Sequence, residues 1–117
     1  MAAVALNTFK TIRKIVSVSE ATVYTCPIGV ATIILLAQVT NVDPADSTPT
    51  VTAVHSRTSE PTFDYKFANE VPIPPNDSLS LVPDGRLVLE TGDSIKISGS
   101  SNNTMHLILS ILETAKQ

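Results

Sequence analysis

A period of two runs through this sequence, with apolar and polar residues alternating along most of its length. The clearest case is the segment 62–68, where Phe63, Tyr65 and Phe67 alternate with Asp64, Lys66 and Ala68. A β-strand points successive side chains to opposite faces, so this period is typical of a half-buried strand. The 3.6-residue periodicity of amphipathic helices is missing from the chain. The sequence therefore predicts an all-β fold.

Turn-forming residues divide the alternating stretches at regular intervals, as at Pro27-Ile28-Gly29 and Pro83-Asp84-Gly85. The segment 71–75 holds three prolines, so we expect it at a sheet edge or in a connection. Short strands with regular turns are typical of an antiparallel β-sandwich or jelly roll. The expected strands cover residues 12–18, 21–25, 30–42, 50–56, 62–68, 78–82, 86–90, 94–98 and 105–112.

The length of the chain corresponds to one domain. It has 117 residues, of which 43% are hydrophobic and 16% charged, enough for a core without disulfides or metals. We expect residues 20–117 to form a single β-sandwich domain and residues 1–19 to form an N-terminal extended arm or first strand. The segment 1–6 lacks a basic stretch, so a secretory signal is not expected.

Two expected strands are apolar on both faces, which is unusual for a small sandwich. In 30–42, one face carries Ile33 and Leu35 and the other carries Ile34 and Leu36. A short helix over 31–38 is the competing interpretation, and the β-branched residues there disfavour it. The strand 105–112 is two-faced as well. Apolar surface on both sides indicates contact with neighbouring subunits, and so a homo-oligomer of three or more copies. The candidate contact residues are Ile34, Leu36, Ile108 and Leu112.

Lys10, Arg13 and Lys14 form the only basic cluster, near the N-terminus. One interpretation is an arm that binds an acidic surface on a partner protein. The blander interpretation, which we favour, is a solvated strand face. The net charge of −3 and the pI of about 5.2 argue against a nucleic-acid partner. The longest apolar run, residues 33–37, is too short to span a membrane.

The sequence offers no constellation typical of catalysis or of a bound cofactor. His55 and His106 lie on different expected strands without cysteine or carboxylate at ligand spacing, so no metal site is expected. Cys26 lacks a basic neighbour and is expected to be buried and inert. Asp43, with Asp46 and Ser47, departs from the calcium-loop pattern and fits capping of a turn.

A sugar-binding protein or a glycosidase is also disfavoured by the composition. The chain has no tryptophan and two tyrosines, so aromatic platforms for sugars are scarce. The aromatic side chains of Phe63, Tyr65 and Phe67 are expected to point inward. The acidic residues are scattered at turns and strand ends, whereas glycoside hydrolysis needs two carboxylates that flank a cleft. We therefore expect no enzymatic activity.

Two parts of the sequence resemble small virion proteins of tailed bacteriophages, particularly those of the cyanophage type. The first part is Val23–Gly29 (VYTCPIG), which leads into an apolar strand and then Gln38–Asp43 (QVTNVD). The second is Val71–Pro75 (VPIPP), followed by Arg86–Ile95 (RLVLETGDSI) before a last strand. The resemblance covers approximately residues 20 to 113.

This resemblance implies a structural protein of the virion with a β-sandwich fold and no catalytic residue. The first hypothesis is a capsid decoration (cement) protein that stabilises the head by packing against the major capsid protein and other subunits. The alternative places the same domain in the tail, at the neck, baseplate or fibres, among tail proteins. A third hypothesis, from another class, is a carbohydrate-binding module that contacts the host surface.

Overall fold

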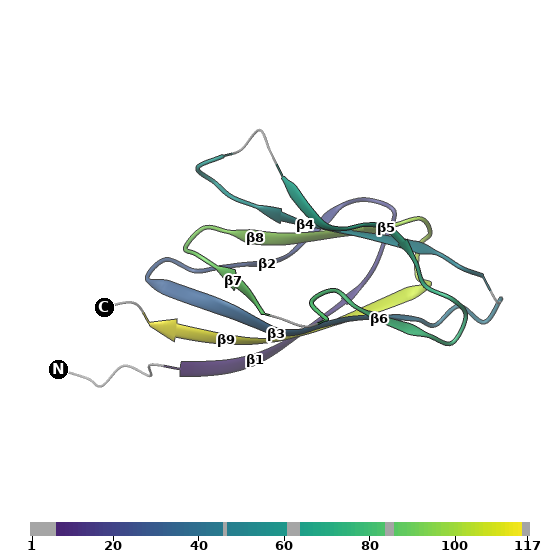
Figure 1. The fold of residues 1–117 in the computed structure, drawn as a ribbon, viewed down its shortest axis with the longest axis horizontal. Helices are drawn as coiled ribbons and strands as arrows, with labels where there is room; N and C mark the ends of the chain where they lie inside the picture. The colour runs from purple at the N-terminus through teal and green to yellow at the C-terminus, as the bar shows by residue number, and fades with distance from the viewer. Residues whose placement is uncertain (1–6, 46, 61–63, 84–85, 116–117) are drawn as a thin grey trace.

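The computed structural model describes residues 7–45, 47–60, 64–83 and 86–115. Within these residues the chain folds into two antiparallel sheets that lie face to face, as Figure 1 shows. The predicted all-β sandwich is confirmed. The strands are β1 (Asn7–Ile15), β2 (Ala21–Thr25), β3 (Val30–Asn41), β4 (Thr50–Ser56), β5 (Tyr65–Pro72), β6 (Ser78–Ser80), β7 (Leu87–Leu89), β8 (Ser94–Gly99) and β9 (Met105–Ala115).

The order of the strands is that of a jelly roll. The first sheet has the order β1-β9-β3-β6, with the short β7 also paired to β3, and the second has the order β2-β8-β4-β5. The chain therefore crosses from one sheet to the other after β1, β2, β3, β5, β7 and β8. Eight strands in two sheets with this winding make a jelly roll, and β7 is an additional short strand.

Residues 7–15 of the N-terminal segment form a strand, one of the two forms expected for residues 1–19. Residues 7–15 pair with β9 without a break, from Asn7 opposite Thr114 to Ile15 opposite His106. β1 is therefore an edge strand of the first sheet, and the domain extends at least to residue 7 rather than beginning at residue 20. The strand also begins five residues before the expected 12–18. Residues 1–6 of the expected arm lie outside the described residues.

A β-bulge in β3 corrects the assignment of Ile34. The register of β3 against β9 shifts between Ile34 and Leu36, and this inserts one residue into the strand. Ile34 and Ala37 consequently face the same side, the core, although they are separated by an odd number of positions. Ile34 is 1% exposed, so it is a core residue and not a subunit contact, whereas Leu35 and Leu36 are both exposed.

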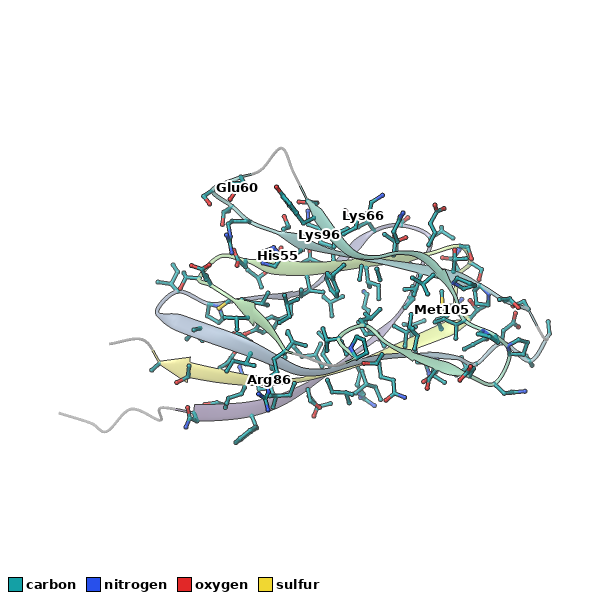
Figure 2. All side chains as sticks on the ribbon, in the orientation of Figure 1. His55, Glu60, Lys66, Arg86, Lys96 and Met105 are labelled. Atoms are coloured by element: carbon teal, nitrogen blue, oxygen red, sulfur yellow. The ribbon has the colours of Figure 1, made fainter. Side chains whose placement is uncertain are left out.

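The core fills the space between the two sheets. Figure 2 shows the side chain of Met105 between the layers, and it is fully buried. Buried polar groups in the described part are hydrogen-bonded. The Asn41 amide, for example, donates to the carbonyl oxygens of Ser47 and Ile73 and accepts from the amide of Asp43. The largest fully buried side chains are Ile34, Ile73, Leu89, Ile95, Ile97, Met105, Leu107, Leu109 and Ile111.

Candidate interaction surface

The outer face of the first sheet, turned away from the second, carries large apolar side chains that alternate with polar ones such as Ser110, Gln38 and Thr40. Residues opposite each other in a sheet share a face, so the register identifies its members. One row crosses the sheet from Phe9 through Leu112 and Ile33 to Val88, each paired with the next. We call the following residues the apolar outer face: Phe9, Ile15, Ile33, Leu35, Leu36, Val88, Ile108 and Leu112.

Most of these side chains are open to solvent in the single chain. Phe9 is 72% exposed, Val88 53% and Ile108 44%. Ile33 and Leu112 are half-buried by their neighbours. A hollow of about 190 Å³ lies between Phe9 and Leu35, with Ser110 also in its lining. Of the predicted contact residues, Leu36, Ile108 and Leu112 lie on this face, and Ile34 does not.

The outer face of the second sheet has the opposite character. The register places Thr22 beside Lys96, and Lys96 beside Val54, on that face. Its apolar members in the described strands are Val54, which is 3% exposed, and Pro72, which is opposite Thr50. Figure 2 shows Lys66 on the outer side of this layer. The two outer faces thus differ in polarity, and large exposed apolar patches are typical of interaction sites. The other members are Thr52, Ser56, Ser94 and Ser98.

The basic cluster of β1 is divided between the two faces of the strand. Lys10 and Lys14 are opposite the core residues Ile111 and Leu107, whereas Arg13 is opposite Ile108 on the outer face. The cluster is therefore not one basic patch on a free arm.

Lys10 belongs to a polar group at the edge between the sheets. Its ammonium group lies 3.0 Å from Glu113, and Tyr24 donates a 2.5 Å hydrogen bond to the same carboxylate. The hydrogen bond from Tyr24, followed by that from Lys10, lowers the pKa of Glu113. Burial, followed by the contact with Glu113, raises the pKa of Tyr24. This group joins β1, β9 and β2 and leaves Lys10 engaged within the chain.

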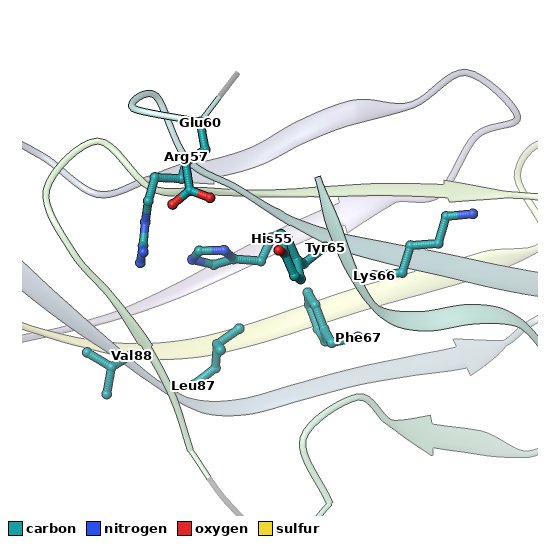
Figure 3. Close-up of a pocket in the computed structure, with 8 residues that line it drawn as sticks. All are labelled: His55, Arg57, Glu60, Tyr65, Lys66, Phe67, Leu87 and Val88. Atoms are coloured by element: carbon teal, nitrogen blue, oxygen red, sulfur yellow. The ribbon is translucent and has the colours of Figure 1, made fainter. Parts of the chain in front are cut away.

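A cleft of about 510 Å³ opens between the sheets on the side of β5 and β7 (Figure 3). Tyr65 and Phe67 line it from β5, and Leu87 lines it from β7, together with the polar side chains of His55 and Arg57. Tyr65 pairs with His55 on the inward side of the sheet, yet it is 68% exposed. Tyr65 therefore points inward, as predicted, but it is not buried in the core, because β5 is an edge strand and the sandwich is open there. Phe63 lies outside the described residues.

Buried Asp93 organises the wall of this cleft. Arg57 donates to both oxygens of its carboxylate at 2.9 Å, and the His55 Nε2 lies 3.1 Å away. The hydrogen bonds from Arg57 are the main cause of the shift of the Asp93 pKa to about 2, and the amide of Glu90 adds to it. Asp93 in turn raises the pKa of Arg57. The function of this arrangement is structural, because it ties the β7–β8 turn to the end of β4.

Gly92 in the same turn has a positive φ of 87°. A β-carbon there would lie 2.6 Å from the Oγ1 of Thr58, which donates a hydrogen bond to the carbonyl of Gly92. Glycine is required at this position for both its conformation and its size.

The remaining residues singled out in the sequence are separate from one another. His55 lies inside the second sheet and His106 on the outer side of the first. No group of three potential metal-binding side chains occurs among the described residues. Cys26 is free and 1% exposed. Asp43 accepts hydrogen bonds from Ser47 and the amide of Ala45, and these lower its pKa.

No family model matches the sequence, and neither does any curated protein sequence. The fold is similar to that of a solved protein described under "Bacillus endospore appendages form a novel family of disulfide-linked pili". The TM-score is 0.55 with 12% identity, over 100% of this chain and 98% of the other. At this identity the likeness concerns the fold alone. The part of the chain that the structure describes contains no helix able to span a bilayer.

Proposed function

We propose that this chain is a structural subunit of a virus particle, a capsid decoration (cement) protein of a tailed bacteriophage. The observation that carries the proposal is the contrast between the apolar outer face of the first sheet and the polar outer face of the second. An apolar face is stabilised when neighbouring subunits cover it, at about 25 cal/mol for each Å² of apolar surface. Repeated over many copies, such contacts strengthen a shell.

Two further points support a structural role. Jelly rolls occur in viral capsid domains, although this is an analogy at the level of fold. The solved protein with a similar fold is described as a pilus protein, which also assembles from subunits. Its title speaks of disulfide linkage. A chain of copies joined in series through disulfides needs two cysteines in each copy, and this sequence has one. Cys26 is also 1% exposed and so is not placed to link a pair, and contacts between copies are non-covalent in our proposal.

The copy number in purified particles tests the proposal. Quantitative mass spectrometry of virions should find hundreds of copies, in a fixed ratio to the major capsid protein. A few copies to a few dozen would place the chain in the neck, baseplate or fibres, which is our alternative. Absence from virions would overturn the virion proposal, and recovery from a filamentous appendage would then favour a pilus-like subunit.

A carbohydrate-binding module is the second candidate, and the cleft beside β5 is the observation that favours it. The exposed ring of Tyr65 can stack on a sugar, and Arg57, Glu60 and Lys66 in the lining can hydrogen-bond to hydroxyl groups. Lectin domains also use the jelly roll. A glycan array tests this candidate. Binding that Tyr65→Ala abolishes and Thr22→Ala preserves would support it, and no binding to any glycan would exclude it.

A further inference from the structure

We infer that the apolar outer face packs against the same face of a second copy of this chain, so that two first sheets lie face to face about a two-fold axis. This inference rests on the proposed structural role and names the partner that covers the face. It requires that the face can approach its own copy, that it is large enough, and that it fits itself. The described residues meet each of these requirements.

Charge permits the approach. The chain carries a net charge of −3, yet Arg13 is the only lysine, arginine, aspartate or glutamate at the outward positions of the described strands β1, β9, β3, β6 and β7 of this sheet. The acidic residues that repel one copy from another therefore lie elsewhere on the molecule. Two copies meet with the least electrostatic repulsion when these faces turn toward each other.

The size of the face matches what a stable pair needs. Four strands side by side, β1, β9, β3 and β6 or β7, span about 19 Å at roughly 4.8 Å a strand. The nine residues of β1 extend about 30 Å at roughly 3.3 Å a residue. One face thus covers about 570 Å², and two faces together cover about 1,140 Å², which exceeds the roughly 1,000 Å² expected of a biological interface.

The face matches itself in β1 and β9. Consider a two-fold axis that runs across the strands through Ser110. It places each strand over the same strand of the second copy, and the two run in opposite directions. Leu112 then lies opposite Ile108 of the second copy, and Phe9 lies opposite Arg13 of the second copy, because each pair is spaced evenly about the centre. Both contacts occur twice. Arg13 thereby meets an aromatic ring, which attracts a guanidinium group, instead of another cation. The same axis places Ile33 of β3 opposite Gln38 of the second copy.

Sedimentation velocity of the purified chain tests the inference. We expect the wild type to sediment at about 25 kDa, twice its mass of 12.4 kDa, at micromolar concentration. Ile108→Lys places a charge in the centre of the pair and should raise the dissociation constant about 100-fold. Phe9→Lys, on the edge strand and already 72% exposed, should act in the same direction without disturbing the core. Thr22→Lys adds the same charge to the opposite, polar face and should leave the pair intact.

Each other outcome overturns the inference. A wild type that stays monomeric, an odd-numbered oligomer, or a dimer that survives both Ile108→Lys and Phe9→Lys would each exclude this pairing. Circular dichroism and thermal unfolding must show that the variants are folded. The proposed function is tested by a separate outcome. If the wild type is monomeric but Ile108→Lys no longer joins virions, a different virion protein covers the face, and the structural role stands while the self-pairing does not.

Discussion

The ion pair between Asp93 and Arg57 makes a prediction about acid stability. The carboxylate of Asp93 has a pKa of about 2 in the folded chain, against an ordinary value of 3.8, and its residue is 1% exposed. A difference of about 1.8 pKa units corresponds to about 2 kcal/mol of stability. The folded pKa is the lower one, so this contribution is complete above pH 4 and is lost as the pH falls through 2.

Asp93→Asn removes this contribution, and urea unfolding followed by circular dichroism measures the loss. At pH 5 we expect the variant to be less stable than the wild type by at least about 2 kcal/mol. At pH 2 the gap should be smaller by about 2 kcal/mol, because the wild type has lost the same charge. The control is Glu90→Gln. Glu90 pairs with the same Arg57 but has a side chain that is 64% exposed, so its replacement should change stability by less than about 1 kcal/mol. A gap between Asp93→Asn and wild type that stays constant from pH 5 to pH 2 would refute this reasoning.

Three further predictions concern stability and reactivity. Ile34→Ala should lower the free energy of unfolding by about 2–5 kcal/mol, whereas Leu36→Ala should lower it by less than about 1.5 kcal/mol, and equal losses would contradict the bulge. Gly92→Ala should lower the free energy of unfolding by about 2 kcal/mol, and Gly29→Ala should lower it by about 1 kcal/mol. Both residues have a positive φ, but Gly29 has open space around it. Urea titrations measure both losses, and a larger loss for Gly29→Ala would contradict this reasoning. Cys26 should resist a thiol reagent in the native chain and react fully in urea, and fast native labelling would contradict its burial.

Much of the sandwich could be predicted because alternation survives in most strands. The segments 21–25 and 50–56 match β2 and β4 at both ends. Both segments are bounded by turn residues, so their ends agree with the structure, and β2 contains a register shift between Thr22 and Tyr24 that its pattern does not show. β9 was predicted to end at Leu112 but continues to Ala115. β3 pairs with its last three residues, and β1 pairs with Glu113 and Thr114.

The bulge at Leu35 could not be predicted from the sequence. Strict alternation places Ile34 and Leu36 on one face. The inserted residue between them puts the residues up to Ile34 on the opposite faces from those that alternation predicts. The bulge lies where β6 and β7 leave a gap along the edge of β3, so it depends on pairings distant in sequence. The sequence shows that this strand is apolar on both faces. Only the register shows that Ile34 faces the core and that Leu36 faces the surface.

The first five residues of the N-terminal strand and the cleft were missed for a similar reason. Residues 7–11 (NTFKT) carry a weak pattern, and only the length of β9 shows that they pair. The exposure of Tyr65 follows from the position of β5 at an open edge rather than from its own alternation. The sequence does hold one signal for the interaction surface, namely the apolar residues on both faces of 105–112, and that signal led to Ile108 and Leu112.

Hydroxyl-radical footprinting of the assembled particle and of the monomer, obtained by dilution until the pair dissociates, tests the central claim most directly, because it reads the exposure of individual side chains. The account predicts that Phe9 and Ile108 are strongly protected in the assembled particle and reactive in a dissociated chain. Tyr65 in the cleft should react equally in both and serves as the internal reference. Unchanged reactivity of Phe9 and Ile108 after assembly would contradict the claim that the apolar outer face is the surface through which this chain assembles.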